Sequence, residues 1–105
     1  MIKELLTASG LPYKETQWGR TPPAKTYAIY TDDVEADGPD YENRIFIHSP
    51  TIELYEPTPD PEAEAAVERE LNARGLKWHK QSRYWVQDAQ RYQVIYDGFS
   101  YIEKI

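Results

Sequence analysis

The positions of apolar residues along the chain predict two helices separated by strands. At the start, Ile2, Leu5, Leu6 and Ser9 follow the i, i+3, i+4, i+7 spacing of one helix face. Residues 10–12 (GLP) then supply a left-handed cap, its apolar partner and a stop. The first element is therefore expected to be a short helix.

The second predicted helix has both ends marked in the sequence. Asp60 is a good N-cap, and Pro61 suits the first helical position because its missing N–H is not needed there. Gly75, followed by Leu76, has the pattern of a glycine cap at the other end. The face turned to the sheet would be a narrow stripe of small residues: Ala63, Ala66, Val67 and Leu71.

Strands are predicted on both sides of this helix. Residues 26–31 (TYAIYT) are β-branched or aromatic and apolar on both faces, which is typical of a central strand. A strand from Tyr41 to Glu56 would be bent or divided at Pro50, which has no N–H to donate. Residues 13–25 have no clean periodicity and are expected to form an arm or loop anchored by Trp18.

The C-terminal third is predicted to form two more strands. Residues 76–86 alternate in character and would form one strand with a bulge at 81–82. Residues 87–90 form the turn, and residues 91–102 the last strand, with a bulge at Gly98.

The resulting order is α-β-β-α-β-β over residues 1–105. It predicts a single α+β domain with a mostly antiparallel sheet of four or five strands and two helices, most simply on one face. The length suits one domain with a single two-layer core.

Composition narrows the classes of function. A net charge of −6 and a pI near 4.8 argue against non-specific binding to nucleic acid or anionic membranes. With no cysteine, the chain has no thiol nucleophile or thiolate metal site. No apolar run approaches the ~20 residues of a membrane helix, so a soluble intracellular protein is expected. Nine Tyr and three Trp against two Phe favour a protein that assembles.

Catalytic and metal chemistry have little support in the sequence. His48 and His79 fall in different predicted strands, without the spacing of a triad or a ligand set, and are interpreted as ordinary strand positions. The acidic stretch 32–42 lacks the alternating pattern of a calcium loop, and no glycine-rich phosphate loop is present. We therefore expect no catalytic residue, no metal site and no cofactor.

Two charged stretches are the candidate contact surfaces. Residues 32–42 contain acids but no base and are predicted to form a long, solvated hairpin tip. Residues 74–83 are basic and interleaved with aromatics, a pattern that can bind single-stranded nucleic acid. The plain alternative is a strand whose lysines discourage aggregation and whose aromatics pack on a helix. In a third reading, this basic strip meets the acidic loop of a neighbouring copy. The candidate interface residues are Asp32, Asp33, Glu35, Asp37, Asp40, Glu42, Lys77, Trp78, Lys80 and Arg83.

Several motifs in this order resemble a known family. They are IELY at 52–55, DPE at 60–62, Gly75, and Y-x-V-I-Y at 92–96. Together with the N-terminal helix and the 27–30 strand, they resemble the tail-terminator, tail-completion and head-tail joining proteins of long-tailed bacteriophages and prophages. The Ser49-Pro50 pair departs from the uninterrupted strand that is more usual there.

The resemblance implies a non-catalytic subunit that forms a ring, commonly a hexamer, at the head-proximal end of the tail tube. Its partners would be copies of itself, the tail tube protein and the head-tail connector, and the genome would pass through without specific binding. It would be found in the virion tail or neck, and in the host cytoplasm during assembly. The alternative is a small ligand-binding or regulatory α+β domain, which needs a concave apolar pocket between helix and sheet. A hydrolase is a weaker alternative, since no nucleophile or base stands out.

Overall fold

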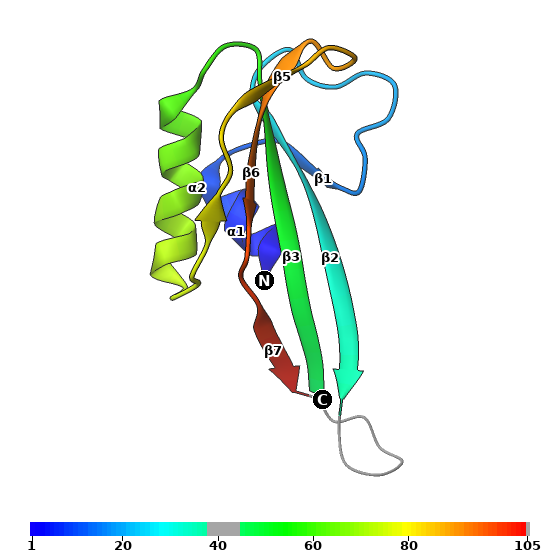
Figure 1. Ribbon diagram of the computed structural model, residues 1–105, viewed down its shortest axis with the longest axis vertical. Helices are drawn as coiled ribbons and strands as arrows, with labels where there is room; N and C mark the ends of the chain where they lie inside the picture. Colours follow the sequence, from blue (N-terminus) through cyan, green and yellow to red (C-terminus); the bar gives the residue numbers. More distant parts are fainter. Residues whose placement is uncertain (38–44, 105) are drawn as a thin grey trace.

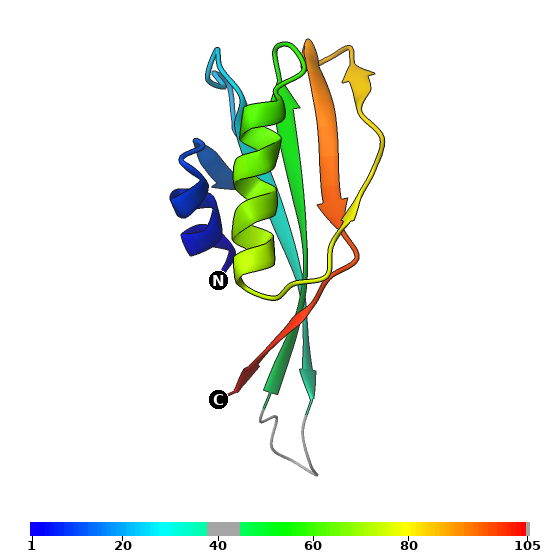
Figure 2. The same ribbon diagram turned by 90° about the vertical axis from the view of Figure 1, so that its left-hand side faces the viewer.

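The protein is a sheet covered on one face by two helices. A computed structural model describes residues 1–37 and 45–104. Helices α1 (Ile2–Ser9) and α2 (Pro61–Ala73) lie on the same side of a twisted sheet (Figures 1 and 2). In the described part of the chain, the strands are β1 (Tyr13–Glu15), β2 (Tyr27–Asp37), β3 (Ile45–Glu56), β4 (His79–Lys80), β5 (Tyr84–Val86), β6 (Arg91–Asp97) and β7 (Tyr101–Lys104). The predicted α+β class, with both helices on one face, is confirmed.

The sheet is built around β3. Its order is β1-β2-β3-β6-β4, with β5 also paired to β6 and β7 also paired to β3. β3 pairs with β2 from Ile45 to Tyr55, and its other side pairs first with β7 and then with β6. Among the described strands, only β1 runs parallel to its neighbour, so the sheet is mostly antiparallel, as predicted. The far halves of β2 and β3, together with β7, extend beyond the helices as a narrow three-stranded wing (Figure 2).

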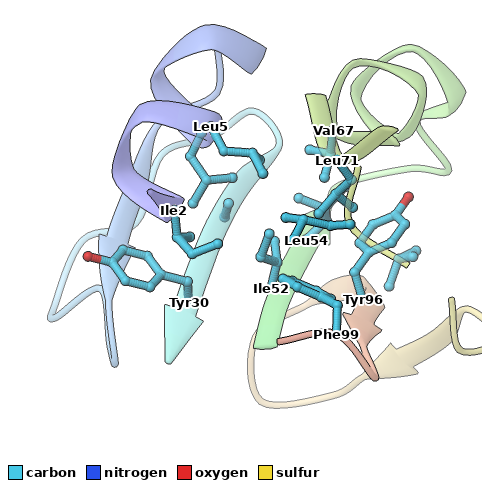
Figure 3. Packing of buried hydrophobic residues seen from close by; sticks show 13 residues of the cluster. Ile2, Leu5, Tyr30, Ile52, Leu54, Val67, Leu71, Tyr96 and Phe99 are labelled. Carbon is cyan, nitrogen blue, oxygen red and sulfur yellow. The ribbon is translucent and has the colours of Figure 1, made fainter. Parts of the chain in front are cut away.

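The core lies between the helices and the sheet. Alternate strand residues point towards the helices, as the period of two in a β-strand requires. Side chains of α1 and α2 fill the space opposite them (Figure 3). The central members are Leu5, Leu6, Ala28, Tyr30, Ile52, Leu54, Val67, Leu71, Val94 and Tyr96, all 5% exposed or less.

The helix ends follow the sequence signals. Gly10 has a φ of 79° at the end of α1, in the left-handed region that glycine adopts without strain. At the start of α2, the Asp60 carboxylate accepts a hydrogen bond from the Ala63 N–H at 3.1 Å and another from the Thr26 hydroxyl at 2.5 Å. At its end, Gly75 has a φ of 69°. Both predicted helices are confirmed.

The expectation of a break at Pro50 was wrong, since β3 is one continuous strand. Even-numbered residues of β3 turn their backbone groups towards β6 and β7. Pro50 lies between Ile52, which pairs with Tyr96 of β6, and His48, which pairs with Tyr101 of β7. Its missing N–H therefore falls where β6 has ended and β7 has not begun, so no ladder hydrogen bond is lost.

Two segments expected to be loops are strands. Tyr13–Glu15 forms β1, parallel to β2, whereas the whole of 13–25 was expected to be irregular. The acidic residues from Asp32 to Asp37 belong to β2, because they pair in register with β3 as far as Ile45. The remaining hairpin residues, including Asp40 and Glu42, lie outside the described residues.

The two last predicted strands are each divided. The expected strand at 76–86 appears as β4 and β5, interrupted at 81–83, which includes the position of the predicted bulge. The expected strand at 91–102 appears as β6 and β7 around Gly98, whose φ is 76°. A side chain at Gly98 would also meet the His79 Cβ at 3.3 Å, so this position needs glycine for both reasons.

Replacing the N-cap residue of α2 tests how much the cap stabilises the protein. Asp60→Ala removes an acceptor from the first turn and leaves the Thr26 hydroxyl without its partner. We expect it to lower the free energy of unfolding by about 1–2 kcal/mol, measured by urea denaturation. Glu62→Ala is the matched control, because it removes an exposed charge from the same turn without removing the cap. Equal losses in the two variants would contradict the capping role.

Candidate functional site

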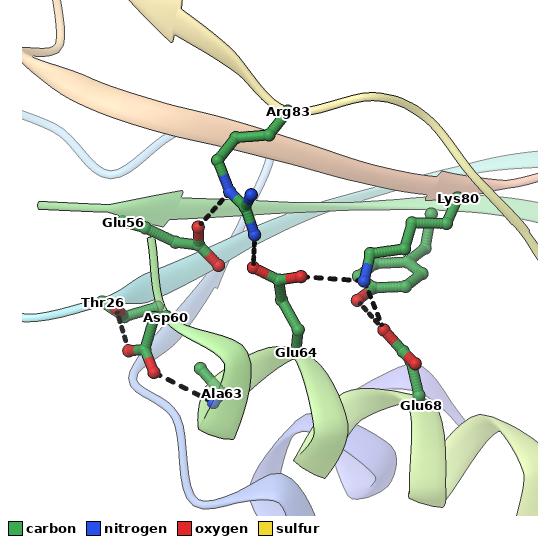
Figure 4. A network of polar contacts seen from close by, with 9 residues as sticks. Thr26, Glu56, Asp60, Ala63, Glu64, Glu68, Lys80 and Arg83 are labelled. Carbon is green, nitrogen blue, oxygen red and sulfur yellow. Dashed lines mark hydrogen bonds and ion pairs between the residues drawn. The ribbon is translucent and has the colours of Figure 1, made fainter. Parts of the chain in front are cut away.

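A network of ion pairs joins α2 to the strands that follow it (Figure 4). The Arg83 guanidinium donates from Nε to Glu56 Oε1 at 3.1 Å, and a second nitrogen donates to Glu64. The Lys80 ammonium lies 2.8 Å from Glu64 Oε1 and 2.8 Å from Glu68 Oε2. Two cations and three carboxylates are therefore linked in one chain of contacts.

Local structure explains why these side chains meet. Glu64 and Glu68 are four residues apart and so share one face of α2. Glu56 is the last residue of β3 and points to the same side of the sheet as Ile52 and Leu54. Lys80 is the last residue of β4 and Arg83 lies in the interruption before β5, and both side chains reach the helix.

Burial and charge give the two central carboxyls opposite behaviour. Glu56 is 0% exposed, and burial, followed by the nearby Glu64 carboxylate, raises its pKa to about 7 against the opposing effect of Arg83. Burial alone would raise the pKa of Glu64, but its interactions with Glu56, Lys80 and Arg83 outweigh this and lower it to about 2. The charges of Lys80, Arg83, Glu64 and Glu68 balance without Glu56. Its Oε2 has no hydrogen-bond partner among the described residues, which also disfavours ionisation.

The network holds residues 79–86 against α2 through the ion pairs of Lys80 and Arg83. A hollow of about 270 Å³ beside it is lined by Glu64, Lys80, Gln81, Ser82, Arg83 and Val94. The charged groups in that lining are paired with one another, so their charges are balanced within the subunit. The Tyr96 hydroxyl completes the network by donating to Glu68 at 2.7 Å. The arrangement is therefore best explained as structural: its ion pairs attach the segment that contains Lys80 and Arg83 to α2.

A second charged cluster holds the wing together. His48 of β3 lies between Asp32 of β2, with Nδ1 2.6 Å from Oδ2, and Glu103 of β7, with Nε2 3.0 Å from Oε1. Its ring stacks on Tyr101 with the ring centroids 4.5 Å apart. The hydrogen bond to Asp32 raises the pKa of His48, and Glu103 adds to the effect against the opposing influence of burial. His48 is in a strand, as predicted, but its two carboxylate partners were missed.

The predicted acidic surface divides between the two sides of the wing. Asp32 points to the side of His48 and is 16% exposed. Asp33 and Glu35 alternate with it, so they lie on the face that carries no helix, and both are exposed. Asp37 is the last residue of β2.

The predicted basic strip also divides. Lys80 and Arg83 are engaged by carboxylates of the same subunit, so these two candidates do not present free charge. Trp78 packs edge-on against Tyr96, with centroids 5.6 Å apart, and donates to Asn72 at 2.9 Å. Lys77 is exposed and forms no ion pair with the residues that the structure describes.

The face without helices carries a row of aromatic residues that the sequence reading did not single out. Tyr27, Tyr55 and Tyr84 are aligned in register across the sheet, with Gln93 between Tyr55 and Tyr84. Tyr27 stacks on Tyr55 with centroids 5.2 Å apart, and Trp18 of the 16–26 arm covers Tyr27 at 5.2 Å. The expected anchoring role of Trp18 is confirmed. A hollow of about 650 Å³ lies here, bounded by the arm and by residues 86–89.

Searches for a metal site, for a membrane-spanning helix and for known relatives identify no further functional site in the described residues. Among residues 1–37 and 45–104, no group of three or more His, Cys, Asp or Glu side chains is placed to hold a metal ion. Neither helix in that part of the chain has the length and apolar character that crossing a membrane requires. Comparison of the chain with protein-family models, with curated proteins and with solved structures finds no match.

The raised pKa of Glu56 predicts how stability depends on pH. A carboxyl whose pKa is higher in the folded state stabilises the fold fully below about pH 4.5, and this contribution is lost as pH rises through 7. We expect the free energy of unfolding to fall on the order of 2 kcal/mol between pH 5 and 8 from this group. Glu56→Gln keeps an acceptor for Arg83 and should remove this part of the loss.

Urea denaturation of both proteins at several pH values measures the difference directly. His48, with its raised pKa, contributes a loss of the same sign in both proteins, so only the difference between them reports on Glu56. Identical pH profiles for the wild type and Glu56→Gln would show that Glu56 is ionised throughout.

Proposed function

We propose that this chain is a structural subunit that assembles with copies of itself into a ring, at the head-proximal end of a bacteriophage tail tube. The observation that carries the assembly part is the sheet, which extends beyond its two helices as a wing with open strand edges. The molecule measures 49 × 29 × 23 Å, so it is elongated.

Open, regular strand edges are uncommon on proteins that act alone, because they template pairing with other chains. The wing carries exposed apolar side chains as well: Val34 is 50% exposed and Ile102 61%. A subunit whose edges are covered by neighbouring copies explains both features without a catalytic role.

The phage context rests on the sequence resemblance, and the structure is compatible with it. The IELY residues lie in the buried second half of β3, and the DPE residues form the capped start of α2. A net charge of −6 suits a ring through which DNA slides without being held. In this proposal the tail tube protein and the head-tail connector bind the two ends of the ring.

A ligand-binding domain is less well supported. The space between helices and sheet is filled by core side chains, whereas that function calls for a concave apolar pocket there. The larger hollow, about 650 Å³ in volume, lies on the helix-free face beside the 16–26 arm, so it is not the pocket between helix and sheet that this function requires.

Mass measurement and electron microscopy of the purified protein test the proposal. We expect closed particles with a central opening and a single dominant mass, a whole multiple of 12.3 kDa and most simply a hexamer. A protein that stays monomeric up to its solubility limit would contradict ring assembly.

A further inference from the structure

Two edges of the sheet are open at opposite sides of the molecule. On one side, β1 covers the outer edge of β2 only as far as Tyr30, and no described strand pairs with that edge from Thr31 to Ala36. On the other side, β4 is the last strand of the sheet. Figure 1 shows β2 and β4 on opposite flanks, with the lower half of β2 uncovered.

The backbone at each edge is oriented for hydrogen bonding. The Ala28 N–H donates outward to Pro12 and the Tyr30 carbonyl accepts from Thr16, each at 2.8 Å, so even-numbered residues of β2 turn outward. Beyond β1 these are Asp32, Val34 and Ala36. On β4, the Gln81 N–H donates inward to Ile95 at 2.9 Å, so Lys80 turns its backbone groups outward.

The two edges are also aligned along the strand direction. Lys80 is opposite Tyr96, Tyr96 is opposite Ile52, and Ile52 is opposite Tyr30. β4 is therefore level with the point where the open edge of β2 begins. Three successive antiparallel pairings make β4 antiparallel to β2, so a copy rotated about an axis along the strands brings its β4 beside β2 in antiparallel orientation.

The exposed charges on the two edges have opposite signs. Asp33 and Glu35 lie on the helix-free face of the β2 edge and are exposed. His79 is on the same face of β4, but its Nδ1 lies 3.3 Å from the Asp97 carboxylate of the same subunit. Lys77, two residues before His79, is exposed and has no ion pair with the residues described. Pairing like edges would oppose acid to acid or base to base, whereas pairing unlike edges joins opposite charges.

We infer that the partner of the open β2 edge is β4 of a second copy of this chain, antiparallel to it, with Lys77 facing Asp33. The inference rests on the proposed assembly and specifies its contact. The interface is heterologous, since each copy uses a different edge on either side, and such contacts generate rings when the rotation closes. Lys80 and Arg83 keep their bonds to α2 and hold β4 in place for its neighbour.

Charge reversal on one edge at a time tests the contact. We expect Lys77→Glu and Asp33→Lys each to weaken association at least tenfold, measured by sedimentation over a range of concentrations at low salt. An equimolar mixture of the two variants should assemble again, because every contact then joins opposite charges. Lys25→Glu, an equal charge change in the exposed arm, should assemble like the wild type.

The possible outcomes distinguish a failure of the β4 to β2 contact from a failure of the ring proposal. If the wild type assembles and either single reversal has no effect, or the mixture does not recover, the β4 to β2 contact is wrong and the ring proposal stands. If the wild type is monomeric at all concentrations, the ring proposal fails and the contact fails with it. Circular dichroism and urea unfolding of each variant identify any loss of assembly that comes from misfolding.

Discussion

Strand β3 is the constraint on which the rest of the structure depends. Pro50, Ile52, Leu54 and Glu56 alternate along it and are all fully buried. Fully burying an aliphatic side chain such as Ile52 or Leu54 contributes about 1.5–3 kcal/mol, and both helices pack over these positions. Every other long strand is attached directly to β3, on one side or the other. The connection from Glu56 to α2 is short, so the end of β3 also fixes where the helix begins.

Glu56, at the end of this strand, is a buried carboxyl that the fold surrounds with paired charges. Alternation carries a carboxyl into the same row as Ile52 and Leu54, where an isolated ion would be unfavourable. Arg83 reaches it from the interruption between β4 and β5, and Glu64 and Lys80 extend the contacts to α2. The edge strand is thus held by ion pairs on the helix side, while the Lys77 side chain is exposed. The same alternation that defines the core separates internal charges from those available to a partner.

Features set by neighbouring residues could be predicted from the sequence. The caps at Gly10, Asp60 and Gly75 require only a few consecutive residues, and both helices were predicted from them. The errors concern long-range pairing. Pro50 is tolerated because its neighbour strand is interrupted some 50 positions later, and Asp32 to Asp37 remain extended because β3 pairs with them. The engagement of Lys80 and Arg83 by α2 could not be predicted, because spacing along one strand does not show which charges face it across the core.

The central claim is that the open edge of β2 is covered when the protein assembles. Amide hydrogen exchange measures this directly, since the N–H groups of Asp32, Val34 and Ala36 point to that edge, while those of Asp33 and Glu35 point to β3 and provide an internal reference. We expect the three outward amides to exchange rapidly in dilute monomer and slowly in the assembled protein, with the reference amides protected in both. Rapid exchange of the outward amides in the assembled protein would contradict it.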